Sequence, residues 1–372
     1  MLTKFSVSNF KGFKDKFVFD LSQAQNYSFN KESVKDGIVN NAIVYGKNGV
    51  GKSNLGLAIF DIVEHLTDNE GGNKEYSFFL NAQSNENMAR FRYEFLFDFI
   101  PVVYEYQKKE HKTVISETLY IDGQMLASID RTESNKATVN MKGAENLRRE
   151  ITNESISLLK YIKSNTVLDT EDKYNIAFLE LYKFVEGMLF FKSLEGKSYM
   201  GLEVGTRDIQ QDIIERDNVK DFESFLNKAG IKSSLSIIER DNKSLLAFEF
   251  GNEKIPLYSI ASQGTKALTL FYFWFQRLRE DSNVSFLFID EFDAFYHHEL
   301  SRLIVEELKN TGIQFVLTTH NTTIMSNELL RPDCYFLMNE RVIKPLSQAT
   351  NKEIREAHNL EKMYKSSTFN VQ

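Results

Sequence analysis

The stretch GKNGVGKS, residues 46–53, matches the pattern Gly-x-x-x-x-Gly-Lys-Ser/Thr in full. It follows the short apolar run AIVY, residues 42–45, and leads into the helical pattern SNLGLAIFDIVEHL, residues 53–66. A strand, a glycine loop and a helix in this order let backbone N–H groups converge on phosphate oxygens at the helix N-terminus. The stretch therefore predicts a phosphate-binding loop (P-loop) that follows a buried parallel strand.

The end of this loop carries the chemistry. We expect Lys52 to reach the terminal phosphates of a nucleotide and the Ser53 hydroxyl to join the shell of a Mg²⁺ ion. A structural turn without a ligand is the alternative interpretation of the same pattern. The predicted ATP-binding residues are Gly46, Lys47, Asn48, Gly49, Val50, Gly51, Lys52, Ser53 and Asn54.

Two further apolar runs end in polar side chains. The run FLFIDEF, residues 286–292, contains Asp290 and Glu291 at the end of a predicted core strand. We expect Asp290 to hold Mg²⁺ through water and Glu291 to accept a proton from the attacking water. The run QFVLTTH ends in His320. Because the carboxyl ends of parallel strands meet at one crevice, His320 is predicted to hydrogen-bond the γ-phosphate or the water, with a structural histidine as the alternative.

The stretch SIASQGTKAL, residues 259–268, places hydroxyls and a glycine at the start of an apolar helical pattern. Ser262, Gly264 and Thr265 would present a helix N-terminus to an anion. Since the P-loop already covers one face of the nucleotide, this second helix end is best used by a neighbouring copy. We therefore expect a homo-oligomer in which two heads enclose two ATP molecules. A helix cap formed by Ser262 or Thr265 is compatible with that role.

The order of the elements indicates an α/β fold with a mostly parallel sheet flanked by helices. We assign residues 1–135 to the first half of this fold, opened by an antiparallel hairpin over the first twenty residues, and residues 250–372 to its second half. Long amphipathic patterns between them predict a helical insertion over residues 136–249. Its expected helices cover residues 146–162, 173–191 and 207–230.

Composition limits the class of protein. The 372 residues are 42% hydrophobic and 26% charged, which is typical of a soluble globular chain, and no stretch approaches the roughly 20 apolar residues of a membrane span. The single cysteine rules out a disulfide framework, and no signal pattern opens the chain, so we expect a cytoplasmic protein. A net charge of −7 counts against a nucleic-acid surface over the whole molecule. The run Lys11, Lys14 and Lys16 leaves DNA binding open, with a solvated hairpin as the alternative.

Together these motifs resemble the ABC-type ATPase heads of the SMC and RecF lineage. Within it, they are most similar to the stand-alone ATPases of bacterial abortive-infection and anti-phage loci. The resemblance covers both ends of the chain and little of the middle. It runs through NFKGF (9–13), GKNGVGKS, SQGTKAL, FLFIDEFDAFYHHEL, FVLTTHNTTIM, LLRPDCYFL (329–337) and HNLEKMY (358–364).

The resemblance implies an ABC-type P-loop NTPase head with an N-terminal antiparallel hairpin lobe and a helical insertion, using ATP and Mg²⁺. It assigns the roles of phosphate and metal binding, hydrolytic base and switch to the residues named above, with Ser262 and Gly264 acting across a dimer. The metal-contacting glutamine that usually follows the first helix is assigned to Gln83, with a plain loop residue as the alternative. Two departures stand out: Ser-Gln-Gly-Thr replaces the Leu-Ser-Gly-Gly of transporters, which argues against transport, and the tail YKSSTFNVQ has serines where the family commonly carries glycine.

The function implied by the resemblance is that of an ATP-hydrolysing sensor and regulator in anti-phage defence, with a phage protein as a possible trigger. No TOPRIM-like carboxylate pattern follows His320, so we expect the nuclease effector to be a separate protein. The alternative is a RecF-like DNA-repair ATPase that clamps DNA. It predicts a basic groove and salt-sensitive DNA binding.

Overall fold

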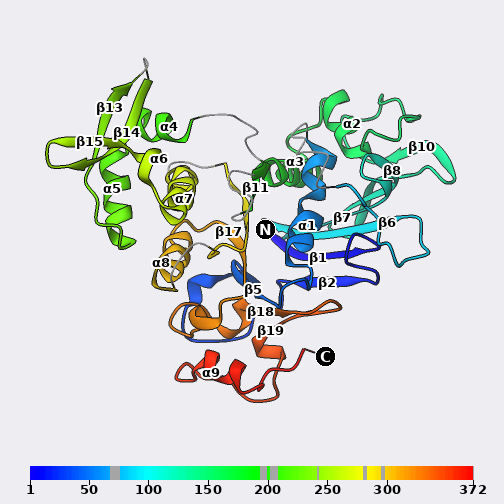
Figure 1. The fold of residues 1–372 in the computed structure, drawn as a ribbon. Helices are drawn as coiled ribbons and strands as arrows, with labels where there is room; N and C mark the ends of the chain where they lie inside the picture. Colours follow the sequence, from blue (N-terminus) through cyan, green and yellow to red (C-terminus); the bar gives the residue numbers. More distant parts are fainter. Residues whose placement is uncertain are drawn as a thin grey trace.

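The computed structural model describes residues 1–67, 76–192, 199–201, 208–240, 243–279, 283–294 and 298–371. In this part of the chain, two seven-stranded sheets and two smaller ones are present. Figure 1 shows the antiparallel sheet, in blue and cyan, on one side of the central sheet and a smaller green lobe on the other. None of the helices in these ranges is long and apolar enough to cross a bilayer.

The antiparallel sheet begins with the predicted hairpin. Strand β1 (Leu2–Ser8) pairs antiparallel with β2 (Phe17–Asp20), which confirms that prediction, and β1 also pairs with β6 (Ala89–Phe97). Buried residues alternate with more exposed ones along β6, so one face of the sheet packs on the core and the other meets water. The sheet continues through β7 (Ile100–Glu110), β8 (Thr113–Ile121), β9 (Gln124–Asp130) and β10 (Ser134–Val139).

The central sheet is mostly parallel, as the sequence predicts. Strands β5 (Asn41–Tyr45), β16 (Phe286–Asp290) and β17 (Gln314–Thr319) are buried at every residue, which is why their sequences are nearly continuous apolar runs. β17 pairs in parallel with both β5 and β16, so the carboxyl ends of the three strands lie side by side. The full order is β12 (Tyr199–Gly201), β11 (Met188–Lys192), β16, β17, β5, β18 (Tyr335–Met338) and β19 (Ile343–Pro345).

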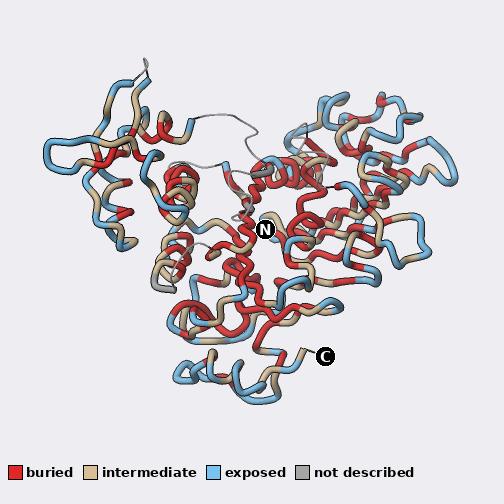
Figure 2. Tube along the Cα trace, viewed as in Figure 1, coloured by how far each residue is buried: buried red, intermediate tan, exposed pale blue. Residues whose placement is uncertain are grey.

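Helix α1 (Lys52–Leu66) lies between the two large sheets. It contacts β11, β12 and β16 of the central sheet, and the backbone oxygen of Ala58 in α1 accepts a hydrogen bond from Tyr93 of the antiparallel sheet. Twelve of its fifteen residues are buried, as Figure 2 shows for the centre of the molecule. Helices α7 (Gln263–Arg279) and α8 (His298–Lys309) lie on the other side of the central sheet (Figure 1). Helix α1, which follows the P-loop, is therefore packed between the central sheet and the antiparallel sheet.

The middle of the chain differs from the predicted helical insertion. The expected helix over residues 173–191 is wrong at its end, because α3 (Lys173–Glu186) stops and β11 enters the central sheet parallel to β16. A short continuous apolar run such as MLFF fits a buried strand as well as a buried helix, so its pattern cannot separate the two. The expected helix over residues 146–162 is also mostly wrong, since α2 spans only Leu158–Asn165.

The predicted helix over residues 207–230 is present as two helices, α4 (Ile209–Glu215) and α5 (Val219–Lys228). They pack with α7 and a small antiparallel sheet around a second hydrophobic core. That sheet consists of β13 (Leu235–Arg240), β14 (Lys243–Phe250) and β15 (Glu253–Pro256). The domain boundaries at 135 and 249 stay a prediction. The remaining short elements are β3 (Val34–Lys35), β4 (Ile38–Val39), α6 (Leu257–Ile260), α9 (Leu360–Lys365) and 3-10 turns at Lys31–Ser33, Thr322–Ile324, Pro332–Cys334 and Leu346–Gln348.

Candidate nucleotide site

The strand, loop and helix predicted around residues 46–53 are present, and two glycines explain the shape of the loop. Gly46 follows β5, where a Cβ atom would come within 2.9 Å of the Met338 carbonyl oxygen. Gly51 precedes α1 with φ of 102°, a conformation that side chains with a Cβ rarely adopt. These positions let the loop turn tightly into the helix, whose first N–H groups have no intrahelical partner.

Lys52 lies inside this loop, with only 4% of its surface exposed. Its Nζ donates to the carbonyl oxygens of Gly46, at 2.9 Å, and Lys47, at 3.2 Å. Burial lowers the pKa of Lys52, while the nearby carboxylates Glu291 and Asp290 act in the opposite direction. The ammonium group therefore lies in the field of both predicted catalytic-site carboxylates, with neutral carbonyls as its direct partners.

The structure brings Ser53 and Asp290 together. The Ser53 hydroxyl donates to Asp290 Oδ2 at 2.5 Å, although the two residues are 237 positions apart in the chain. Asp290 Oδ1 accepts from the Thr318 hydroxyl at 2.6 Å, which fixes the orientation of the carboxylate. Hydroxyl and carboxylate oxygens are ligands that Mg²⁺ accepts, often with several waters retained. Ser53 and Asp290 are therefore residues that would fit a Mg²⁺ ion.

Glu291 has an unusual backbone. Its φ is 47°, in the left-handed region, which costs a non-glycine residue roughly 1–2 kcal/mol. Its N–H donates to the Thr318 hydroxyl oxygen at 2.8 Å, so Thr318 holds Asp290 and Glu291 at once. Strained conformations of this kind cluster at functional sites. Thr318 is not among the residues predicted from the sequence, because a threonine inside an apolar strand carries no recognisable pattern.

The end of β17 is tied to the turn that follows Glu291. Thr319 donates from its hydroxyl to Asp293 Oδ1 at 2.7 Å and accepts from the N–H of Asn321 at 2.9 Å. Burial raises the pKa of Asp293, and hydrogen bonds from Thr319 and Asn321 partly oppose the rise. His320 is exposed and follows directly on β17. The structure thus places His320 at the same sheet edge as Asp290 and Glu291, while its predicted contact with phosphate remains a prediction.

Ser262 forms the cap of α7. Its Oγ accepts from the N–H of Thr265 at 3.1 Å and shares a hydrogen bond with the Thr265 hydroxyl at 2.8 Å. Thr265 is buried, so its hydroxyl acts within the cap, whereas Ser262 is exposed and Gly264 is half-buried. The structure thus shows the helix cap that the sequence predicts for Ser262 or Thr265. The role of these residues across a dimer stays a prediction.

Gln83 lies in an exposed loop before β6. Its N–H donates to Asn81 Oδ1 at 2.9 Å, and the Asn81 side chain donates to the carbonyl oxygen of Lys11 at 2.6 Å, which ties this loop to the N-terminal hairpin turn. The metal role of Gln83 stays a prediction. In the register of the central sheet, Lys192 at the end of β11 lies opposite Asp290.

Comparisons with known proteins bear on the family and the fold. A family model described as "AAA domain, putative AbiEii toxin, Type IV TA system" matches residues 42–326. Among solved structures, an SMC head bound to the C-winged helix domain of ScpA is similar over 92% of this chain and 96% of that chain, at 17% identity and a TM-score of 0.52. This likeness confirms the predicted class of fold.

Two more SMC heads are similar at lower scores. One is the head domain from Thermotoga maritima, at 16% identity over 92% of this chain and 98% of that chain, with a TM-score of 0.44. The other is a head with an extended coiled coil bound to the C-terminal domain of ScpA derived from Pyrococcus furiosus, at 15% identity over 98% of both chains, with a TM-score of 0.48. No curated protein matches the chain at a significant level.

Proposed function

The chain belongs to this family of AAA domains, and on that premise we propose that it binds and hydrolyses ATP as a regulator of an anti-phage, abortive-infection system. One observation carries the ATPase part of the proposal: the Ser53 hydroxyl meets Asp290 Oδ2 at 2.5 Å, beside the P-loop lysine. A nucleotide site needs a hydroxyl and a carboxylate at this place to hold Mg²⁺ against the phosphates. Here two distant parts of the chain supply them.

Each remaining side chain has a defined task in this proposal. The N–H groups of residues 46–54 and the Lys52 ammonium bind the triphosphate. Glu291 would accept a proton from the attacking water, a role supported by its position directly after Asp290 in the chain. His320 contacts the γ-phosphate from the end of β17. Gln83 remains the candidate for a further metal contact.

We further propose that two copies associate around two ATP molecules. Ser262 is exposed at the start of the 17-residue helix α7, and the N-terminal end of a long helix attracts an anion. In the dimer, Ser262 and Gly264 of one copy would face the triphosphate held by Lys52 of the other. ATP binding would thereby control assembly, which suits a regulator better than rapid turnover.

The partner in this proposal is a separate nuclease, released or activated when a phage protein changes the assembly in the cytoplasm. The name of the matched family points to abortive infection. Within that class, we propose that the chain is of the same kind as the ATPase component of the PARIS anti-phage system. Purification from cells together with the products of neighbouring genes tests this partner directly. A co-purified nuclease supports the proposal, whereas DNA held in a salt-sensitive manner would favour the RecF-like alternative.

The assembly is tested by mass measurement of the Glu291→Gln variant with and without ATP. We expect hydrolysis to fall by about 100-fold or more while ATP binding persists, so that the dimer accumulates. Ser262→Arg should prevent the dimer, and Thr132→Arg, at an exposed turn between β9 and β10, should not. A Glu291→Gln chain that stays monomeric with ATP contradicts the assembly. Unchanged hydrolysis contradicts the assignment of the base.

A further inference from the structure

An exposed phenylalanine follows α1 in the chain and has no role in the site described above. The Phe78 side chain has 93% of its surface exposed, whereas that of its neighbour Phe79 has 7%. The φ angle of Phe78 is 53°, in the left-handed region that residues with a Cβ atom seldom occupy. Strained backbone of this kind often marks a place where a ligand is bound.

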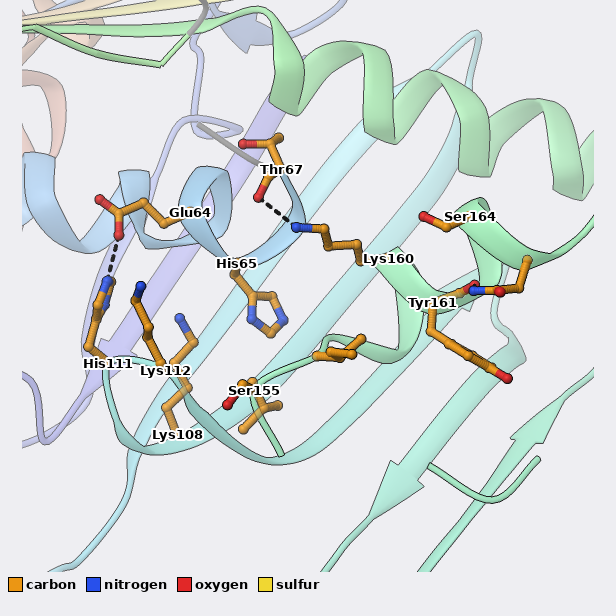
Figure 3. Close-up of a pocket in the computed structure, with 13 residues that line it drawn as sticks. Glu64, His65, Thr67, Lys108, His111, Lys112, Ser155, Lys160, Tyr161 and Ser164 are labelled. Atoms are coloured by element: carbon orange, nitrogen blue, oxygen red, sulfur yellow. Dashed lines mark hydrogen bonds and ion pairs between the residues drawn. The ribbon is translucent and has the colours of Figure 1, made fainter. Parts of the chain in front are cut away.

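The residues on one side of Phe78 are anchored to α1. Tyr76 donates from its hydroxyl to the carbonyl oxygen of Leu57 in α1 at 3.2 Å. The ring of Tyr76 also stacks on His111, with the ring centroids 4.1 Å apart. Figure 3 shows His111 turned towards Glu64 of α1, to which it is hydrogen-bonded. The loop that carries Phe78 is therefore fixed to the same helix that follows the P-loop.

The loop is also bound to the N-terminal hairpin turn. The Lys11 N–H donates to the carbonyl oxygen of Phe79 at 3.0 Å, and Lys11 Nζ donates to that of Ser77 at 3.2 Å. The rings of Phe79 and Phe10 meet edge to face, with their centroids 5.2 Å apart. Phe78 thus lies between two residues that are hydrogen-bonded to the hairpin turn, while its own ring is directed to solvent.

The hairpin turn packs directly on the start of α1. A Cβ atom on Gly12 would come within 3.0 Å of Asn54 Nδ2, and a Cβ atom on Gly51 would lie 3.7 Å from the ring of Phe13. The first turn of α1 therefore contacts the hairpin turn of the antiparallel sheet as well as Asp290 at the end of β16. A ligand bound at this turn of the helix has the metal-binding carboxylate on one side and the hairpin turn on another.

Given the ATP site of the proposed function, on which this step rests, we propose that Phe78 stacks on the base of the bound nucleotide. In that site the terminal phosphates and the metal lie towards Asp290, so the ribose and base extend away from it, along the border formed by the hairpin turn. An aromatic ring offers a flat apolar face to a base, and every base has a π-face that can stack on it. Phe78 is then a binding residue that distinguishes a nucleotide from a bare triphosphate.

Calorimetric titration with ATP and with tripolyphosphate tests this inference, because the two ligands differ in the nucleoside and share the phosphate chain. Titrations in the Ser262→Arg chain, which is expected to be monomeric, keep assembly out of the measured affinity. We expect Phe78→Ala to weaken ATP binding by about tenfold and to leave tripolyphosphate binding unchanged. Phe99→Ala is the matched control, because Phe99 is also exposed and also has a left-handed backbone, at the opposite end of β6.

The conservative variant Phe78→Trp should keep the ATP affinity and report the contact by fluorescence. We expect ATP to quench the added indole and tripolyphosphate to leave it unchanged, because only the ligand with a base can stack. The chain has one native tryptophan, Trp274, whose signal is subtracted. In the control Phe99→Trp, neither ligand should change the added signal.

Two results overturn the inference. One is an equal ATP affinity for Phe78→Ala and Phe99→Ala, and the other is a loss of tripolyphosphate binding in Phe78→Ala as large as the loss of ATP binding. Circular dichroism verifies that the variants fold; if Phe78→Ala does not, Phe78→Leu replaces it, since leucine is apolar and has no aromatic face. If the chain with native Phe78 binds ATP and either result is found, the stacking alone fails and the proposed function stands. If that chain binds neither ligand, the proposed function fails as well.

Discussion

The two ends of α1 hold charged groups in opposite ways. At its start, Lys52 donates to backbone carbonyls, and the exposed Ser53 donates a hydrogen bond to Asp290 at the end of β16. Near its end, Asp61 pairs with Lys108 at 2.7 Å, and both side chains are at most 2% exposed. At the start, which we call the open end because Ser53 is exposed, the Lys52 ammonium has neutral carbonyls as its direct partners. Near the end, which we call the buried end, opposite charges pair inside the protein.

This difference separates function from stability within one helix. Groups at the start are oriented by weak neutral partners, so a triphosphate and a metal can exchange with those partners at small cost. Groups near the end already have their counter-charges, and removing one partner leaves the other buried and uncompensated. Substitutions at the start should therefore change binding and rate, whereas those near the end should change the free energy of unfolding.

The largest expected effect is on stability at the buried end. Lys108→Met leaves the Asp61 carboxylate without its main counter-charge, and we expect a loss of about 3–5 kcal/mol in the free energy of unfolding. Denaturant unfolding measures it as a shift of the midpoint. Lys109→Met is the control, because Lys109 is exposed on the same strand and should change stability by no more than about 0.5 kcal/mol. Equal shifts for the two variants would remove the contrast between the two ends.

The next effect is on binding at the open end. Lys52→Ala removes the ammonium that would contact the terminal phosphates, and we expect ATP affinity to fall by about 100-fold, or about 2.7 kcal/mol. The unfolding midpoint should change little, because the partners that Lys52 loses are two carbonyl oxygens near solvent. Titration with ATP measures the affinity. An unchanged ATP affinity would show that the glycine loop is not a phosphate site.

The open end was predictable from sequence and the buried end was not. Residues 46–53 are contiguous, and Asp290 and Glu291 are neighbours at the end of one apolar run, so a short pattern contains their chemistry. Lys108 instead lies 47 positions from Asp61, on β7 of the antiparallel sheet, and only folding brings the two together. A pairing between distant elements leaves no mark in a local pattern.

The fold shows the same limit. The parallel strands at both ends of the chain were predicted, because each is a bounded apolar run next to a recognisable motif. The sequence of β11 predicts a continuation of helix α3, because a single glycine, Gly187, separates the two elements. Its identity as a strand depends on pairing with β16, which is a long-range contact. Thr318 could not be predicted for a related reason: its role depends on hydrogen bonds to Asp290 and Glu291 at the end of the neighbouring strand β16.

Acid is expected to lower the free energy of unfolding through the Asp61 carboxylate at the buried end. Burial alone would raise the pKa of Asp61, but the charge of Lys108 and the bond and charge from His111 lower it to about 2, from 3.8 in the unfolded chain. A depressed folded pKa contributes stability above pH 3.8 that is lost as the pH falls towards 2. This amounts to about 2 kcal/mol. Unfolding midpoints between pH 6 and pH 2 measure it, and the Asp61→Asn chain should show a correspondingly shallower loss.

The smallest effect tests whether the open end is oriented by a neutral neighbour. Thr318→Val keeps the shape of the side chain but removes the hydroxyl that holds Asp290 Oδ1 and the N–H of Glu291. We expect ATP hydrolysis to fall about tenfold, or about 1.4 kcal/mol, and half-saturation by Mg²⁺ to need a higher concentration, because the carboxylate loses its fixed orientation. Thr318→Ser retains the hydroxyl and should restore both values. If the role of Thr318 is purely structural, the valine variant should have a lower unfolding midpoint but an unchanged Mg²⁺ dependence of the folded protein. That result would show that Asp290 keeps its orientation without help from β17.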